Sequence, residues 1–394
     1  MDLLEHEGKQ LFAAAGLPVL PSAVATTAAA AREAATGLGL PVVVKAQVES
    51  GGRGKAGGVR VCRDLDEVAT AADEILTMTI GGRPVTGLLL EPAVDIELEL
   101  YLAIAVSRAE RAPVLIFSRH GGVDIEEIAR NHFEAIVRRP LDPLLGPADY
   151  QVRDVLRAAA LDGERRSPNG RPLKEVLAAI VRALWRLYHD RDATLVEINP
   201  LAVTTAGELI CLDSKVTIDD NALGRQPELA ESRRDSDVET RARNAGLAYV
   251  ELEGDIGVLG NGAGLVMATM DQIETAGGAA ANFCDIGGGA GAARVKVALS
   301  LITSSPRVAA VLVNVFGGIT RCDEVARGLL EAFAETCLEV PVVVRLDGNV
   351  GDEGRAILAA GQVPGVTIAA SPAEAVRLVV AAARDAAATP GAEV

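Results

Sequence analysis

Residues 255–276 read DIGVLGNGAGLVMATMDQIETA: a short apolar strand, a glycine turn and a helix-forming segment in direct succession. The same order repeats four more times toward the C-terminus, with apolar strands that begin near residues 279, 307, 340 and 365. Strands that are apolar throughout are typical of parallel sheets covered by helices on both faces. The pattern therefore predicts an α/β fold with a doubly wound parallel sheet in this part of the chain.

Glycine turns in this region stand where a strand meets a helix: NGAG at 261–264, GGGAG at 287–291 and GGIT at 317–320. Such turns present backbone N–H groups and a helix N-terminus, which both favour anions. Ligands of doubly wound sheets bind at the carboxyl ends of the strands. The turns therefore favour an anion site, although glycines that only serve close packing would give the same pattern.

A different glycine-rich loop lies in residues 42–61, VVVKAQVESGGRGKAGGVRV. Its glycines match G-x-G-x-x-G, but a second strand follows them, whereas the dinucleotide fingerprint requires a helix there. A phosphate loop is excluded as well, because Ala56 follows the Gly-Lys pair where that motif has Ser or Thr. The sequence predicts a strand–loop–strand flap that carries Arg53 and Lys55, preceded by Lys45 at the end of a strand.

Residues 193–215, ATLVEINPLAVTTAGELICLDSK, are typical of a β-hairpin that turns at TTAGE. If the turn centres near Ala206, paired positions add up to about 412, so that Asn199 faces Asp213 and Glu197 faces Lys215. These four share one face in this prediction. The apolar face is then expected to hold Val196, Ile198, Ile210 and Leu212.

The polar face of this hairpin is a candidate metal site. A carboxylate and an amide oxygen side by side suit Mg²⁺, which takes one or two protein oxygens and fills its other positions with water and phosphate oxygens. A solvated sheet face with a surface ion pair is the alternative. In LLLEPAVDIELELYL, residues 88–102, Glu91 and Glu99 are candidate contacts for an adenine or a ribose, or else ordinary exposed acids.

Composition limits the class of protein. A net charge of −16 argues against general binding to nucleic acids or acidic membranes. The five cysteines form no C-x-x-C, and the N-terminus has no apolar signal core, so we expect a soluble cytoplasmic protein. None of the four histidines lies in a glycine-rich turn, so a phosphorylated nucleophile is not evident in this chain. A charged stretch predicts a domain boundary near residue 238, giving domains 1–238, with the flap-bearing part at about 21–102, and 239–394.

With these motifs in place, the chain resembles the β subunits of succinyl-CoA synthetase (succinate–CoA ligase). The resemblance runs from EHEGKQLFAAAGLPV through GGRGKAGGV, VEINPLAV, CLDSK and NGAGLVMATMD to VLVNVFGGITRCDEVA and PVVVRLDG. It implies an ATP-grasp fold for the first domain, whose flap closes over nucleotide phosphates, joined to a flavodoxin-like ligase domain.

The resemblance also implies roles for individual residues. Asn199 and Asp213 match magnesium ligands, and Glu197 matches a glutamate that meets the partner's histidine during phosphorylation. Positions that match nucleotide contacts are Lys45, Gly52, Arg53, Gly54, Glu91, Val94 (through its backbone) and Glu99. Positions that match the substrate side are Asn261, Gly318, Ile319 and Thr320.

The implied enzyme is an acid–thiol ligase of the tricarboxylic acid cycle with Mg²⁺ and ATP or GTP. Its phosphohistidine belongs to a partner α subunit, which also binds most of CoA. The phosphoryl group passes from the nucleotide to that histidine and then to the acid, and the CoA thiol displaces phosphate.

Several alternatives stay open at this point. Malate–CoA ligase large subunits share these motifs, and a non-catalytic regulatory paralogue or a stand-alone carboxylate–amine ligase is a further reading. Gly224 and the long connection at 161–172 depart from the family pattern and weaken the assignment of succinate. The sequence decides neither between ATP and GTP nor between an αβ dimer and an α2β2 tetramer.

Overall fold

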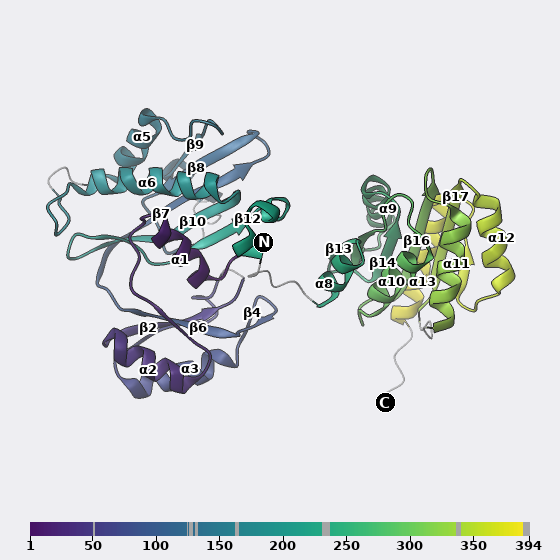
Figure 1. Cartoon of the computed structure of the whole chain (residues 1–394), viewed down its shortest axis with the longest axis horizontal. Coiled ribbons are helices and arrows are strands. Elements are labelled where there is room, and N and C mark those ends of the chain that lie inside the picture. Colours follow the sequence, from purple (N-terminus) through teal and green to yellow (C-terminus); the bar gives the residue numbers. More distant parts are fainter. Residues whose placement is uncertain are drawn as a thin grey trace. The chain divides into compact units, whose positions relative to one another are not determined.

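The computed structural model describes residues 1–49, 52–123, 125, 129–130, 133–161, 165–230, 237–335 and 340–388. The chain forms two compact units, residues 1–233 and 234–394, each with its own sheets and core (Figure 1). The predicted boundary near residue 238 stays a prediction. No helix in the described part of the chain is long and apolar enough to cross a membrane.

The first unit contains a small antiparallel sheet in the order β1-β6-β2-β3, with helices α2 and α3 packed on it (Figure 1). Thr27 caps α2 and Asp64 caps α3, each through a side-chain oxygen that accepts backbone N–H groups of the first turn. The element bounds are β1 Ala23–Ala25, α2 Ala28–Leu38, β2 Val42–Gln47, β3 Val59–Cys62, α3 Leu65–Leu76 and β6 Gly87–Pro92.

The predicted flap is the connection between β2 and β3, which pair antiparallel from Val42 opposite Cys62 to Lys45 opposite Val59. The strand–loop–strand prediction is therefore confirmed for the described residues of this segment. A two-stranded ribbon of β4 (Thr79–Ile80) and β5 (Arg83–Pro84) follows α3.

A larger sheet in the order β11-β10-β7-β8-β9, with β12 also paired to β10, completes the first unit. Its core lies against α1, α5 and α6, where Phe12, Val155 and Leu184 meet the buried side of the strands. The bounds are α1 Glu5–Ala14, β7 Ile96–Ser107, β8 Ala112–Ser118, β9 Ile136–Pro140, α5 Asp149–Ala159, α6 Leu173–Asp190, β10 Ala193–Thr204, β11 Leu209–Cys211 and β12 Lys215–Ile218. Residues 162–164 of the connection at 161–172 lie outside the described residues, and Gly224 lies in the 3-10 turn Asp220–Arg225.

The predicted hairpin register is confirmed. Leu201 pairs with Cys211 and Glu197 pairs with Lys215, so paired positions add up to 412 on both sides of the gap between β11 and β12. The prediction of the apolar face is wrong for the second strand, because the core takes Leu209 and Cys211 in place of Ile210 and Leu212. Side-chain alternation changes phase between Ile198 and Leu201, where β10 also slips by one residue against β7.

The second unit contains one six-stranded sheet in the order β13-β15-β14-β16-β17-β18. Its five parallel strands follow the flavodoxin-like order, with β14 and β16 adjacent at the point where the chain reverses direction across the sheet. The bounds are β13 Ala248–Glu251, β14 Ile256–Gly260, β15 Asn282–Asp285, β16 Ala310–Gly317, β17 Val342–Gly348 and β18 Val366–Ile368. All five predicted strands are present. The sequence analysis missed β13, which pairs antiparallel with β15 at the edge.

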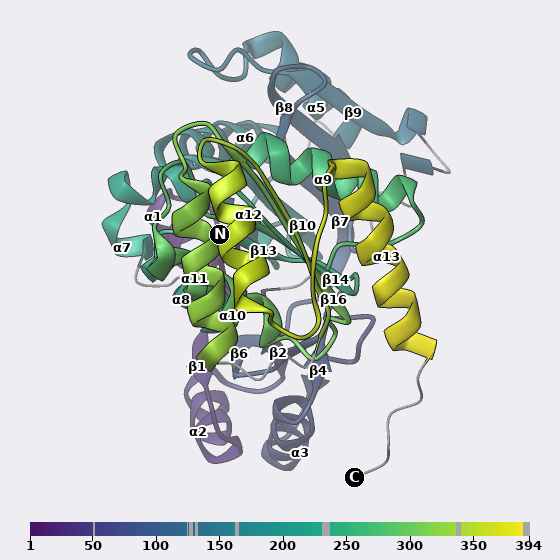
Figure 2. The same ribbon diagram turned by 90° about the vertical axis from the view of Figure 1, so that its right-hand side faces the viewer.

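Helices cover both faces of this sheet, as its apolar strands require. Figure 2 shows α9 and α13 on one side and α10 and α11 on the other, in agreement with two separate core clusters. The helices of this unit are α8 Asp237–Asn244, α9 Ala263–Thr275, α10 Ala292–Thr303, α11 Cys322–Glu335, α12 Gly351–Gly361 and α13 Pro372–Ala388.

Candidate functional site

A cavity of about 550 Å³ lies in the first unit, between the small sheet, the flap and the broken part of the hairpin. It gathers segments that are far apart in the sequence, from α1 to β12. Every site residue predicted for the first domain lines it, namely Lys45, Gly52, Arg53, Gly54, Glu91, Val94, Glu99, Glu197, Asn199 and Asp213.

The break in the hairpin places the two predicted metal ligands in this cavity. Residues 212–214 belong to neither β11 nor β12, and Asn199 and Pro200 stand opposite the single residue Tyr101 of β7. Both strands of the hairpin leave the regular pleat at this place. The pairing register of the hairpin is therefore the same on both sides of the break, while the side chains change from one face of the sheet to the other. Bulges of this kind commonly re-aim side chains next to active sites.

Asn199 and Asp213 differ in how their oxygens are engaged. Asn199 Oδ1 accepts the Gly122 N–H at 2.7 Å while its Nδ2 donates to the Val123 carbonyl at 3.1 Å, which orients the amide. Asp213 Oδ1 accepts the Ser214 N–H at 2.7 Å and the Arg53 guanidinium at 2.5 Å. The pair offers a carboxylate and an amide oxygen, a hard donor set that fits Mg²⁺. In this arrangement the cation next to the Asp213 carboxylate is the Arg53 guanidinium.

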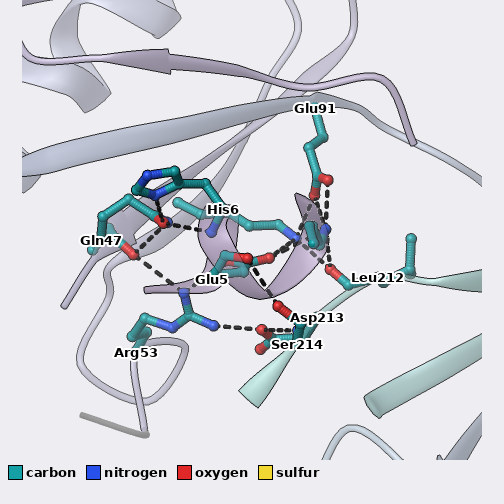
Figure 3. Close-up of polar contacts among 11 residues, drawn as sticks. Glu5, His6, Gln47, Arg53, Glu91, Leu212, Asp213 and Ser214 are labelled. Carbon is teal, nitrogen blue, oxygen red and sulfur yellow. Dashed lines mark hydrogen bonds and ion pairs between the residues drawn. The ribbon is translucent and has the colours of Figure 1, made fainter. Parts of the chain in front are cut away.

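The two cations of the predicted phosphate site are buried and anchored by carboxylates. Lys45 Nζ lies 2.9 Å from Glu5 Oε1 and 2.7 Å from Glu91 Oε2, and it donates to the Leu212 carbonyl at 2.6 Å. Arg53 bridges Glu5 Oε2 at 2.6 Å and Asp213 Oδ1 at 2.5 Å through its two Nη atoms. Figure 3 shows the Glu5 carboxylate at the centre of this cluster, with Arg53 approaching from the flap side.

Lys9 completes the cluster from α1. Its Nζ lies 2.6 Å from Glu91 Oε2 and 3.2 Å from Glu5 Oε1, and it donates to the Leu212 carbonyl at 2.8 Å. We call the set of Glu5, Lys9, Lys45, Arg53, Glu91 and Asp213 the ion cluster. Its three carboxylates and three cations balance in charge.

Electrostatics favours the charged forms of Glu5 and Lys45, whereas burial raises the pKa of Asp213 and lowers that of Lys9. Burial alone would raise the pKa of Glu5, but Lys45, Arg53 and Lys9 outweigh it and hold that pKa well below its usual range. Burial alone would lower the pKa of Lys45, but the carboxylates of Glu5, Glu91 and Asp213 outweigh it and raise that pKa. Both shifts favour the charged forms, so Glu5 is an anion and Lys45 a cation at neutral pH.

The remaining predicted nucleotide contacts are placed at the edge of the same cavity. The Glu91 side chain is buried and holds Lys9 and Lys45, so that a contact with nucleotide would use its backbone or act through Lys45. Val94 follows β6, and its neighbour Ala93 donates its N–H to Pro41 at 2.9 Å. The Glu99 carboxylate lies against Gly122, where an added Cβ would come within 2.2 Å of Glu99 Oε2.

Glu197 is oriented by an aromatic hydroxyl. Its Oε2 accepts the Tyr101 hydroxyl at 2.7 Å, and its side chain lines the cavity next to the bulge. The residue is half-buried, and it lines the cavity together with Asn199. Such a group can hold an imidazole N–H of an incoming histidine.

The four residues predicted for the substrate side lie together in the second unit, at the reversal point of the parallel sheet. Asn261, directly after β14, accepts the Phe316 N–H at 2.9 Å and donates to the Phe316 carbonyl at 2.8 Å and to Thr320 Oγ1 at 3.2 Å. Thr320 is fully buried and also accepts the Gly289 N–H at 3.1 Å. These bonds hold the turn at 318–320, whose Ile319 is 83% exposed.

Comparison with known proteins identifies the family. The family model of the ATP-grasp domain matches residues 2–203, and that of CoA-ligase matches residues 259–382. The succinate–CoA ligase (ADP-forming) subunit beta of Rubrobacter xylanophilus is 49% identical over 391 residues, which cover 98% of this chain and 99% of that protein. The chain belongs to the succinate–CoA ligase β-subunit family.

Other members of the family agree over nearly the same length. The subunits beta from Roseiflexus sp. and Aquifex aeolicus are 46% and 44% identical, over 96% and 91% of this chain and 99% and 93% of theirs. Among solved structures, ATP citrate lyase from Methanothrix soehngenii has a TM-score of 0.69 at 20% identity and covers 96% of this chain and 99% of its own. That likeness is one of fold. The predicted family and the order of its two domains are confirmed.

Three residues of the site went unnoticed in the sequence, namely Glu5, Lys9 and Tyr101. Glu5 and Lys9 lie in the segment EHEGKQLF, which was quoted only as part of the family resemblance, and they are spaced i and i+4 on one side of a helix. This i, i+4 pair of a glutamate and a lysine, together with the predicted strand that carries Lys45, was the sequence signal that could have indicated Glu5 and Lys9 as site residues. Tyr101 carried no signal, because its role depends on the pairing of β7 with β10.

Helix α1 lies unusually close to the broken hairpin, and Gly8 makes this possible. A Cβ at Gly8 would lie 2.6 Å from Ser214 Oγ and 3.3 Å from Val216 Cγ2. Ser214 Oγ in turn donates to the Glu5 carbonyl at 2.8 Å, so α1 is fixed to the loop that carries Asp213.

Gly8→Ala is therefore expected to destabilise the first unit by about 1–3 kcal/mol, because the added methyl overpacks this contact. The matched control is Gly37→Ala on α2, where an added Cβ meets nothing within 4 Å. That control should stabilise by about 0.4–1 kcal/mol through its effect on the unfolded chain. Denaturant unfolding of both variants measures the difference, and equal stabilisation by both would contradict the close approach of α1.

Proposed function

We propose that this chain is the nucleotide-binding subunit of an ADP-forming succinate–CoA ligase that works through a phosphohistidine on a partner α subunit. The observation that carries the proposal is the cavity of about 550 Å³ in the first unit, which gathers Lys45, Arg53, Asn199 and Asp213 from four separate segments. The names of the relatives support succinate as the acid and ATP as the nucleotide. None of these observations favours malate or a purely regulatory role.

The residues of the cavity suit phosphoryl transfer, where positioning and charge stabilisation supply most of the catalysis. The flap glycines Gly52 and Gly54 let backbone N–H groups approach the phosphates, and Lys45 and Arg53 supply two cations. Asn199 and Asp213 would hold Mg²⁺, which neutralises phosphate oxygens when bound. Glu91, Val94 and Glu99 form the nucleoside end of the site.

Glu197 would receive the partner's histidine. Its carboxylate, held by Tyr101 at 2.7 Å, can accept one imidazole N–H and so orient the other ring nitrogen toward the γ-phosphorus. In the second unit, the turn of Gly318, Ile319 and Thr320 and the amide of Asn261 would hold the acid and its phosphate. CoA would be bound mostly by the partner, and we place the assembly in the cytoplasm.

The test is to co-purify the chain with its partner from its own cells and to incubate the complex with Mg²⁺ and γ-labelled ATP or GTP. We expect acid-labile label on the partner, with ATP preferred, and discharge of the label by succinate together with CoA. Discharge by malate alone would reassign the acid. A partner that never becomes labelled despite nucleotide binding would overturn the proposal.

Glu197→Gln is expected to slow phosphorylation of the partner by on the order of 10²-fold while nucleotide affinity changes little, because the neutral amide orients imidazole less well. Single-turnover labelling and nucleotide titration measure the two quantities separately. The matched control is Glu208→Gln in the turn of the same hairpin. Equal losses in rate and affinity would indicate that Glu197 only supports the sheet.

A further inference from the structure

The ion cluster has one member with no assigned role that touches two assigned residues at once. Glu5, in the first turn of α1, has a side chain that is 0% exposed. Its Oε1 faces Lys45 at 2.9 Å. Its Oε2 faces Arg53 at 2.6 Å (Figure 3). One carboxylate therefore holds the strand cation and the flap cation of the phosphate site together.

The position of Glu5 is itself fixed on two sides. Its carbonyl accepts the Ser214 hydroxyl at 2.8 Å, and the preceding Leu3 donates its N–H to Val216 at 2.9 Å. The Glu7 carboxylate accepts the Leu4 N–H at 2.9 Å, which closes the start of the helix. Glu5 is thus part of a rigid base built from α1 and the residues next to Asp213.

Arg53 pairs with two carboxylates, Glu5 and Asp213, and it also donates to the Ala46 carbonyl at 3.3 Å. If a metal ion binds Asp213 through Oδ1, the guanidinium must release that oxygen. Its contact with Glu5 uses the other Nη atom and is not affected by that exchange. Glu5 can therefore keep Arg53 beside the phosphates while Asp213 binds the metal.

From these contacts we infer that Glu5 is a positioning residue of the nucleotide site: it orients the Lys45 ammonium and the Arg53 guanidinium toward the phosphates without touching the reacting atoms. The inference rests on the proposed function. Lys9 stabilises this arrangement because its ammonium pairs with the carboxylates of both Glu5 and Glu91. A set of six charges, most of them buried, is a poor device for stability alone, because apolar side chains of similar volume commonly serve as well or better.

A change of Glu5 to Gln removes the charge and keeps the size. The two cations then lose their common anchor but remain available to phosphates. We therefore expect the single-turnover rate of partner phosphorylation to fall by on the order of 10- to 100-fold. The affinity for Mg-nucleotide should stay unchanged or become tighter, since one competing carboxylate is gone.

The matched control is Glu7→Gln, the same chemical change two residues further along α1. Glutamine also serves at this capping position, so rate, affinity and thermal midpoint should stay close to those of the unchanged complex. A parallel loss of rate and affinity in Glu5→Gln, or no loss of rate, would overturn the inference. Glu5→Asp, which keeps the charge at a shorter reach, should recover part of the rate.

A second readout does not depend on catalysis. Trypsin cleaves after arginine, and Glu5 Oε2 holds the Arg53 guanidinium at 2.6 Å. Cleavage after Arg53 should therefore be several-fold faster in Glu5→Gln than in Glu7→Gln. If the unchanged complex never phosphorylates its partner, the proposed function fails, while equal cleavage rates in the two variants would refute the anchoring by Glu5.

Discussion

Asp213→Asn is expected to reduce nucleotide-dependent phosphorylation of the partner subunit by roughly 10²–10³-fold while the fold stays intact. Asparagine keeps the size of the side chain and an oxygen that can accept the Ser214 N–H, now at 2.7 Å. It lacks the negative charge that faces Arg53 at 2.5 Å and that would attract a divalent cation. The loss should therefore appear in catalysis more than in stability.

Labelling of the partner, titration of nucleotide at several Mg²⁺ concentrations and thermal unfolding measure these three effects. The matched control is Asp66→Asn on α3, whose side chain is 90% exposed and pairs with the exposed Arg32 at 2.9 Å. Magnesium-dependent nucleotide binding should weaken in Asp213→Asn and not in the control. Labelling at the unchanged rate would refute the role of Asp213 as a metal ligand.

Lys45→Met should lower both activity and stability. Methionine fills a similar volume but leaves Glu5 and Glu91 with two cations in place of three in the ion cluster. Removing one partner of a buried ion pair costs about 3–5 kcal/mol, because a charge remains uncompensated. Loss of the proposed phosphate contact should reduce phosphorylation by roughly 10²–10³-fold as well.

The stability difference should depend on pH. In the unchanged protein the pKa of Glu5 lies below its ordinary value of 4.5, so Glu5 contributes stability above that pH, and the contribution is lost as the pH falls below it. Lys45 is one cause of this depression, so Lys45→Met has less of this contribution to lose. The gap in unfolding midpoint should therefore narrow below pH 4.5 relative to neutral pH.

The control for this prediction is Lys174→Met at an exposed position of α6, which removes the same charge from the surface. It should change neither activity nor unfolding midpoint appreciably, because single surface charges contribute little. A Lys45→Met protein as stable as this control at neutral pH would show that the ion cluster does not depend on Lys45.

The sequence alone predicted correctly those parts of the fold that a local pattern of residues determines. Apolar strands between glycine turns predicted the second unit, and the turn at 204–208 predicted the hairpin register. The faces of the hairpin were mispredicted for Ile210 and Leu212, because simple alternation carries no sign that both strands leave the pleat at Asn199 and Asp213. Irregularities of this kind depend on what packs above the sheet, here helix α1.

The sequence also could not predict ion pairs between residues that lie far apart in the chain. Glu5 and Asp213 are 208 positions apart in the sequence and share one arginine in the fold. The edge strand Ala248–Glu251 was missed for a related reason, since its partner Asn282–Asp285 comes later in the chain and its own sequence, AYVE, is too short to stand out. Family resemblance covered both regions but gave no role to the residues of α1.

The balance of charge in the ion cluster also determines how an anion reaches the site. Three carboxylates cancel three cations at close range, so little of their attraction extends into the solvent, while the whole chain carries −16. A nucleotide approaching from solution meets a repulsive field over most of its path, and dissolved salt shortens the reach of that field. We therefore expect little long-range steering of the nucleotide, and we expect selectivity to arise at short range, where its phosphates would meet Lys45 and Arg53.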